Sequence, residues 1–120
     1  MQPFLLAAPL PALDDWGSPE DIGATTLEGP IQVAGAFTLG APDTPVFGGY
    51  YTATRGRYAV TYPFHEHATL IEGELAITAD GATTTYGPGD SWIIAKGTKV
   101  VWEIRSERIA KSYLATITDI

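Results

Sequence analysis

Cysteine is absent from the sequence of 120 residues. Its absence excludes disulfide bonds, a thiolate nucleophile and a zinc site built on cysteine. Positive charge is also scarce, because 7 Lys and Arg residues face 14 Asp and Glu residues, and none of the 7 precedes Arg55. The net charge of −7 leaves no cationic face for phosphate groups. We therefore expect neither nucleic acid nor an anionic membrane as a partner.

Long apolar runs are lacking too, and none approaches the length that spans a membrane. Residues 1–13 are apolar, but no positive charge flanks them, and Pro3, Pro9 and Pro11 would break an apolar helix. We interpret this stretch as an arm rather than a signal peptide, and we expect a cytoplasmic protein.

Helical periodicity is missing as well, whereas glycine (13) and proline (9) are frequent. From Ile31 onward, short β-like runs alternate with turn residues. The predicted strands are 31–39, 46–54, 57–62, 67–78, 82–86, 90–95, 99–105 and 108–118. This spacing predicts an all-β fold, an antiparallel β-sandwich or jelly-roll barrel. We place the barrel at residues 31–120 and an extended arm at 1–30, packed on the barrel or on a partner subunit.

Several short motifs in the last 70 or so residues carry a family resemblance. They are Thr61-Tyr62-Pro63, Leu70-Ile71-Glu72-Gly73-Glu74, Gly87-Pro88-Gly89-Asp90, Lys96-Gly97-Thr98, Trp102-Glu103 and Lys111-Ser112-Tyr113. The chain resembles small cupins of RmlC-like fold grouped around the (S)-ureidoglycine aminohydrolase cupin domain. The resemblance implies a cupin barrel with an interior pocket and a ureide-like compound as one ligand class. Gly73 stands where one strand turns into the next, a place that favours a residue without Cβ strain.

Metal-binding cupins hold their ion with three histidines and one glutamate, and this chain departs from that pattern. Counted from Gly73, Glu66 takes the glutamate position. The histidine positions then fall on Ala59 and Thr61, or one place later on Val60 and Tyr62, and the third falls on Val100. One carboxylate does not hold a transition metal by itself. We expect no metal in the barrel.

His65 and His67 are the only histidines, and they allow a second register. In that register they form the histidine pair and Glu72 is the glutamate, but Ala79 then stands where the motif has glycine. Strand alternation places both imidazoles on the face opposite Glu66. They are exposed or interface residues in this interpretation. A metal site at His65 and His67, with Glu66 or Glu72, remains the alternative, because a bulge after Pro63 would turn them inward.

Glu66 and Lys111 are the polar residues we expect in the pocket. A carboxylate among apolar side chains is a candidate acid, base or hydrogen-bond acceptor, so Glu66 is the best candidate for a catalytic residue, with no other assigned. The predicted ligand-binding set is Glu66, Thr61, Tyr62, Trp92, Trp102 and Lys111. Tyr50, Tyr51 and Tyr86 are candidates for the mouth of the pocket.

Three functions follow from these residues. The leading hypothesis is a small cupin that binds a polar metabolite, with ureides as one ligand class, and without a cofactor. The second is a metal-dependent enzyme that uses His65 and His67. The third is a non-catalytic interaction module that forms a homodimer through its sheets and its apolar arm. Whether any reaction occurs stays open at this point.

Overall fold

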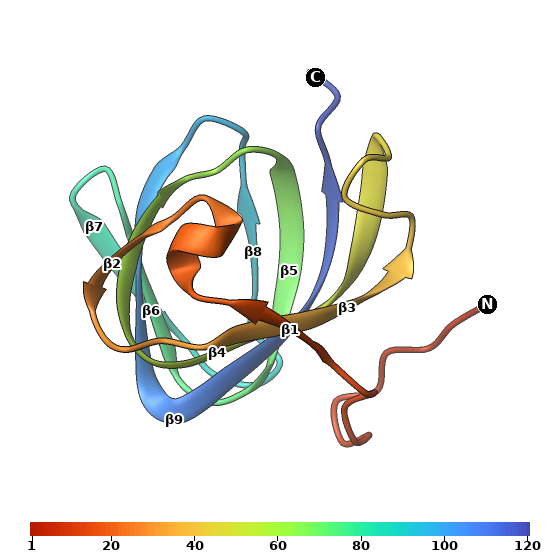
Figure 1. The fold of residues 1–120 in the computed structure, drawn as a ribbon, viewed down its shortest axis with the longest axis horizontal. Coiled ribbons are helices and arrows are strands. Elements are labelled where there is room, and N and C mark those ends of the chain that lie inside the picture. The colour runs from red at the N-terminus through yellow and green to blue at the C-terminus, as the bar shows by residue number, and fades with distance from the viewer.

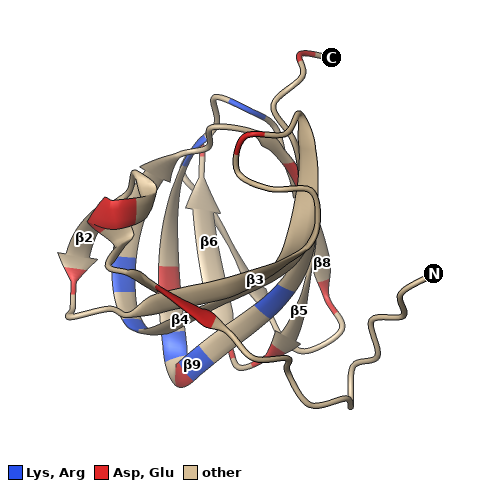
Figure 2. Cartoon of the chain, turned by 45° about the vertical axis from the view of Figure 1, so that its right-hand side comes forward, with Lys and Arg blue, Asp and Glu red and all other residues tan.

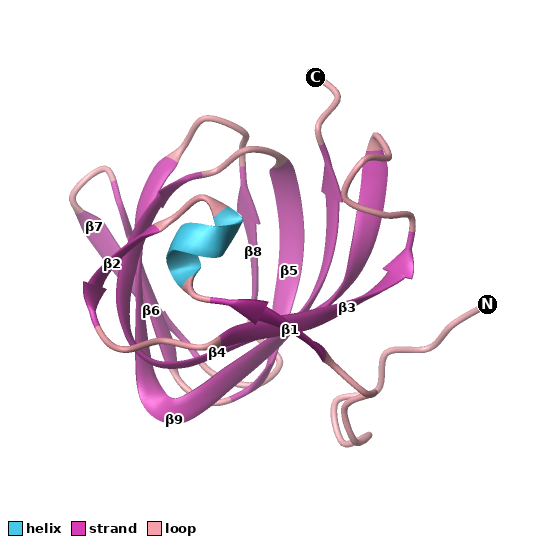
Figure 3. Ribbon diagram, in the orientation of Figure 1, coloured by secondary structure: helices cyan, strands magenta, loops and turns pink.

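The computed structural model describes residues 1–120 as an all-β domain of nine strands and one short 3-10 turn (Figures 1 and 3). The elements are β1 (Asp14–Gly17), η1 (Pro19–Ile22), β2 (Thr25–Glu28), β3 (Val33–Leu39), β4 (Val46–Thr61), β5 (His65–Glu72), β6 (Leu75–Ala79), β7 (Ala82–Tyr86), β8 (Ser91–Ile94) and β9 (Lys99–Thr116). All pairings are antiparallel. The predicted fold class is confirmed. The helical turn η1 is far too short to cross a membrane.

Two long strands connect the two walls of the barrel. One half of β4, residues 46–54, pairs with residues 108–116 of β9, in a wall completed by β1, β3, β5 and β8. The other half, residues 56–61, pairs with residues 99–104 of β9, next to β2, β6 and β7. Each long strand therefore bends from one sheet into the other, and both halves supply side chains to the same interior.

The sequence prediction divided each of these long strands in two at its bend, and the structure corrects this, because both strands are continuous. Turns were predicted at Arg55-Gly56 and at residues 105–107, yet β4 and β9 continue through both. The pairing register shifts between Thr54 and Gly56, where the ladder passes from Arg108 to Ile104. Glycine and small polar residues at a bulged barrel corner resemble those of a hairpin turn, so the sequence pattern did not separate the two.

The prediction of one strand at 67–78 is also wrong, because the structure divides this range into two strands, β5 and β6. Gly73 lies between them with a φ of 90°, in the left-handed region. A Cβ at this position would clash with the carbonyl oxygen of Arg108. The expectation that Gly73 marks a change of strand is confirmed.

The N-terminal segment differs from the predicted arm. Residues 1–13 contain no strand, but β1, η1 and β2 follow within the first 30 residues. β1 pairs with β3, and β2 pairs with β4, so residues 14–28 are part of the barrel wall. Phe4 of the remaining arm packs on Tyr50, with ring centroids 5.2 Å apart. Figure 1 shows η1 in front of the barrel opening.

Charge is unevenly distributed over the strands (Figure 2). Apart from Lys96, every Lys and Arg lies on β4 or β9. Two charged side chains, Glu66 and Lys111, are buried with the apolar core. Buried charges need partners, so these two residues identify the place to examine for function.

Candidate functional site

A cavity of about 570 Å³ opens inside the barrel next to Glu66 and Lys111. Of its 17 lining residues, 12 are hydrophobic. They come from both walls and from the N-terminal segment, and the aromatic members are Trp16, Phe37, Phe47, Tyr51, Tyr58, Tyr62, Phe64 and Tyr113. An apolar cavity of this size with a few convergent polar groups is typical of small-molecule sites.

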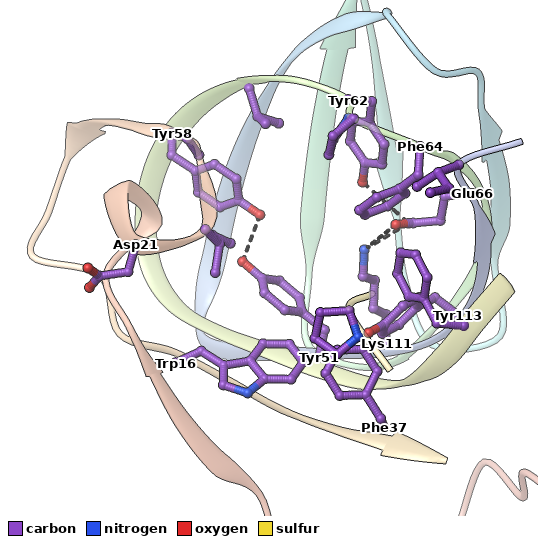
Figure 4. A pocket seen from close by; sticks show the side chains of 17 residues that line it. Trp16, Asp21, Phe37, Tyr51, Tyr58, Tyr62, Phe64, Glu66, Lys111 and Tyr113 are labelled. Carbon is purple, nitrogen blue, oxygen red and sulfur yellow. Dashed lines mark hydrogen bonds and ion pairs between the residues drawn. The ribbon is translucent and has the colours of Figure 1, made fainter. Parts of the chain in front are cut away.

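Glu66 and Lys111 form an ion pair at one side of this cavity (Figure 4). Strand alternation on β5 points Glu66 inward, and β9 brings Lys111 beside it across the sheet. Lys111 Nζ lies 2.7 Å from Glu66 Oε1 and 2.8 Å from Oε2. The side chains are only 6% and 1% exposed, for Lys111 and Glu66 respectively. A pair this buried persists only if further hydrogen bonds satisfy its remaining polar atoms.

Two neighbours provide such bonds to the carboxylate. Trp92 Nε1 donates to Glu66 Oε1 at 3.2 Å, and the Tyr62 hydroxyl donates to the same oxygen at 3.3 Å. Both donors hold the carboxylate in one orientation. Glu66 Oε2, in contrast, accepts only from Lys111.

Aromatic rings enclose the ammonium group of Lys111. Its Nζ lies 4.7 Å from the Trp102 ring centroid, 5.0 Å from that of Tyr51 and 5.2 Å from that of Tyr113. Ring faces attract a cation and partly replace its lost hydration. Burial lowers the pKa of Lys111, although the charge and hydrogen bonds of Glu66 oppose that shift.

A second polar pair, of two hydroxyl groups, also faces the cavity. The hydroxyls of Tyr51 and Tyr58 lie 3.0 Å apart and share one hydrogen bond. Tyr58 stacks on Trp102, with centroids 5.6 Å apart. Figure 4 shows this pair and the Glu66–Lys111 pair on opposite sides of the cavity.

The predicted ligand-binding residues divide into three groups. Glu66, Tyr62 and Lys111 line the cavity. Trp92 and Trp102 are buried behind the lining, where Trp92 supports Glu66 and Trp102 supports Lys111 and Tyr58. Thr61 does not reach the cavity, because alternation at the end of β4 turns it outward.

The same alternation decides between the two possible histidine positions. Val60 and Tyr62 line the cavity, whereas Ala59 and Thr61 do not. Of the two pairs of positions considered, only the later one, Val60 and Tyr62, faces the cavity. Tyr62 of this pair places its hydroxyl beside Glu66.

His65 and His67 lie outside the cavity. His67 is exposed, and His65 Nδ1 accepts a hydrogen bond from the backbone N–H of Lys96 at 3.0 Å. Glu72 is bound by Arg108 through both carboxylate oxygens, at 2.7 and 3.0 Å. No three His, Asp or Glu side chains form a group that could hold a metal ion. The alternative metal site therefore finds no set of ligands in this structure.

Sequence reasoning missed several lining residues. Tyr58 was not singled out and Tyr113 was named only within a family motif, because tyrosine is common in strands and nothing local marks which ring faces a cavity. Trp16 and Asp21 were assigned to the arm, yet they line the cavity. Of the tyrosines proposed for the mouth, Tyr51 lines the cavity. Tyr50 contacts Phe4, and Tyr86 packs on Trp92 with centroids 4.9 Å apart.

Solved structures with the same fold include two EutQ proteins. EutQ of Clostridium difficile is 20% identical, with a TM-score of 0.63 over 75% of this chain and 71% of that chain. A putative ethanolamine utilization protein Q from Salmonella typhimurium is 18% identical, with a TM-score of 0.62 over 76% and 72%. A protein of unknown function from Pseudomonas syringae is 20% identical, with a TM-score of 0.76 over 89% of this chain but 45% of that chain. At these identities the likeness shows the fold alone.

No curated protein matches the sequence. The cupin fold predicted from the sequence is confirmed by these structures, while the finer resemblance to ureidoglycine aminohydrolases stays a prediction. A family match covers residues 40–113, which is more than half of the chain and includes Glu66 and Lys111. This chain therefore belongs to the EutQ-like cupin domain family.

Proposed function

We propose that the barrel binds a small, uncharged molecule that presents a carbonyl oxygen and an N–H group side by side, as carboxamides, lactams and ureides do. The observation that carries this proposal is the buried Glu66–Lys111 pair at the wall of an apolar cavity. The ureide-like ligand expected from the sequence is one member of this class.

Hydrogen-bonding capacity left over at the ion pair supports this choice of ligand. An ammonium group has three N–H donors, and two of those of Lys111 are directed to the two oxygens of Glu66. One donor of Lys111 remains. Glu66 Oε2 accepts a single bond, so it retains acceptor capacity. A free donor next to a free acceptor is complementary to an amide group, which offers the reverse pair.

Charge supports an uncharged ligand. The ion pair is neutral as a whole, so a ligand charge beside it would have no counter-charge. The third charged lining residue, Asp21, is exposed to solvent, and its carboxylate accepts hydrogen bonds from the N–H and hydroxyl of Ser18. Burying an unpaired charge costs far more free energy than burying an amide that is hydrogen-bonded. The aromatic lining provides flat apolar surfaces for the remainder of the molecule.

Calorimetric titration with an aromatic lactam, carbostyril, tests this proposal. Its N-methyl derivative is the matched control ligand, because it keeps the carbonyl but lacks the N–H. We expect carbostyril to bind at least about tenfold more tightly than the N-methyl derivative, since a hydrogen bond to a charged group is lost. Equal affinities for the two compounds would contradict the proposal.

The double variant Glu66→Leu/Lys111→Met provides the protein control. Replacing both members of a buried pair by apolar residues is often neutral for stability, whereas removing one member costs about 3–5 kcal/mol. The double variant should therefore fold and lose carbostyril binding. The exposed pair Glu28–Arg57 offers a matched comparison, and Glu28→Leu/Arg57→Met should bind carbostyril like the wild type. Unchanged binding by the Glu66/Lys111 double variant would overturn the proposal.

We also propose that two copies pair through the outer face of β5, β8 and the end of β9. The outward residues of the patch formed by residues 65–69 of β5, by β8 and by residues 112–116 of β9 include no Asp, Glu, Lys or Arg; they are His65, His67, Thr69, Ser91, Ile93, Ser112, Leu114 and Thr116. Glu72, at the other end of β5, forms an ion pair with Arg108 outside this patch. Ile93 is 78% exposed and Leu114 is 52% exposed. Two chains with a net charge of −7 repel each other, so an uncharged apolar face is where they approach at the lowest cost.

A further inference from the structure

The hydroxyls of Tyr51 and Tyr58 form a polar group that the proposed binding at Glu66 and Lys111 does not use. Tyr51 is 5% exposed and Tyr58 is 3% exposed, and both line the cavity. Their oxygens lie 3.0 Å apart. Figure 4 shows these hydroxyls on the other side of the cavity from the ion pair, although the Tyr51 ring itself lies 5.0 Å from Lys111 Nζ.

Counting hydrogens shows that this pair has one donor too many. Two hydroxyl groups carry two hydrogens, and a single hydrogen bond between them uses one. Neither oxygen has another hydrogen-bond partner in the protein, so the second hydrogen has no protein acceptor. Buried polar hydrogens are nearly always paired, and an unpaired one lowers stability.

Both hydroxyls keep their hydrogens at neutral pH. Burial raises the pKa of Tyr51 and of Tyr58 far above the usual range for tyrosine. The nearby carboxylate of Glu66 acts in the same direction on both. Their shared chemistry is therefore that of a neutral hydrogen-bond donor.

Rigid packing fixes where this donor lies. The Tyr58 ring stacks on Trp102 at an interplanar angle of 29°, and Tyr51 meets the same indole edge-on at 85°. Trp16 packs against Tyr51 from the N-terminal segment, with centroids 6.4 Å apart. A donor held by its neighbours before the ligand arrives loses little freedom on binding.

We infer that the Tyr51–Tyr58 pair is a second specificity-determining site in the cavity, which donates one hydrogen bond to a second oxygen of the ligand, a carbonyl or an ether. This inference rests on the proposed function for the amide-like group of the ligand. The ligand class becomes a small, mostly apolar molecule with an amide-like group and a separate acceptor oxygen.

Two derivatives of carbostyril, each substituted on the ring remote from the lactam, test the inference by calorimetric titration. One carries an acetyl group, and the other carries an isopropenyl group of the same shape without the acceptor. The wild type should bind the acetyl compound about fivefold more tightly, as one neutral hydrogen bond predicts. In the double variant Tyr51→Phe/Tyr58→Phe this preference should disappear. Each single Phe variant keeps one unpaired hydroxyl hydrogen and should retain part of the preference.

Stability is a second measurement, and it needs no ligand. Removing both hydroxyls leaves no unpaired hydrogen, so the double variant should have a Tm equal to or above that of the wild type. The inference is overturned if the double variant retains the preference for the acetyl compound, or if the wild type binds both derivatives equally. Binding of unsubstituted carbostyril in either case leaves the first proposal intact.

A failure of unsubstituted carbostyril to bind is a failure of the proposed function. The tyrosine pair is then tested with acetophenone and α-methylstyrene, which differ in the same carbonyl and carry no lactam. Preference for acetophenone that is lost in the double Phe variant supports the second site. Equal or absent binding of these two probes overturns it.

Discussion

At the scale of single residues, the cavity depends on groups held in one protonation state. The side chains of Tyr51, Tyr58, Tyr62 and Tyr113 line it, and burial raises the pKa of each of these four hydroxyls. Glu66 adds to each shift, because a nearby negative charge disfavours a phenolate. The four phenols remain neutral in the folded protein under conditions where a free tyrosine ionises.

This arrangement predicts a steep loss of stability in alkali. An unfolded chain loses its tyrosine protons near pH 10, while the folded chain retains them, so unfolding releases protons and stability falls as pH rises above about 10. Each of the four groups adds about 1.4 kcal/mol per pH unit to that slope. The lowered pKa of Lys111 makes stability rise with pH, but it is a single group and this effect ends at the usual pKa of lysine.

Urea unfolding at a series of alkaline pH values measures the slope, with tyrosinate absorbance as the second signal. Tyr51→Phe/Tyr58→Phe removes two of the four groups and should reduce the slope by about half. The control is Glu28→Gln, a substitution at an exposed residue, which should leave the slope above pH 10 unchanged. A slope that is flat in the wild type would show that these phenols are not buried.

At the scale of elements, the connection between β5 and β6 depends on Gly73. Its φ of 90° and its contact with the Arg108 carbonyl leave no room for a side chain. Gly81, between β6 and β7, has a φ of 76°, but no atom lies within 4 Å of the place where a Cβ would stand. It therefore has the backbone strain of Gly73 without the crowding, and it serves as the matched comparison.

We expect Gly81→Ala to lower the free energy of unfolding by about 1–2 kcal/mol, from the left-handed backbone alone. Gly73→Ala should cost about 1–3 kcal/mol more, because the new methyl group meets backbone that must move. Chemical denaturation of both variants gives the difference directly. Equal losses would mean that the β5–β6 connection accommodates a side chain.

The strands that carry the site were partly predictable from the sequence. Gly73 and alternation on β5 were enough to place Glu66 inside and His67 outside, because strand geometry fixes both. Lys111 was identified only through its motif, and its distance to Glu66 depends on strand pairing across 45 positions. The bends of β4 and β9 were missed because a bulge at Gly56 has the same residues as a turn.

The N-terminal contribution was missed for a related reason. Gly17, Pro19 and Gly23 are typical of loops, and strands of four residues are too short to show alternation. β1 and β2 form because β3 and β4 offer edges to pair with, and that information lies elsewhere in the chain. Propensity within a short segment does not report such pairing.

At the scale of the whole molecule, the uncharged outer face predicts the oligomeric state. Light scattering of the purified chain should give the mass of a dimer. Leu114→Glu places a charge on this face, so it should shift the mass towards that of a monomer. Leu27 on β2 is 47% exposed but lies elsewhere, and Leu27→Glu should leave the dimer unchanged.

Deletion of residues 1–13 tests the apolar arm in the same measurement. A dimer of unchanged mass and stability would limit the arm to packing on its own barrel, as Phe4 does on Tyr50. A monomeric wild type at all concentrations would overturn the pairing proposal without affecting the cavity.

The N-terminal segment supplies one wall of the cavity, and the barrel strands supply the rest. The family match begins at residue 40, yet Trp16, Asp21, Ile22 and Ala24 line the cavity from outside the matched region. The ion pair lies within that region. Exchange of residues 14–24 for another sequence would thus reshape one wall while Glu66 and Lys111 keep their partners. The shape of the cavity and its polar pair are therefore set by different segments of the chain.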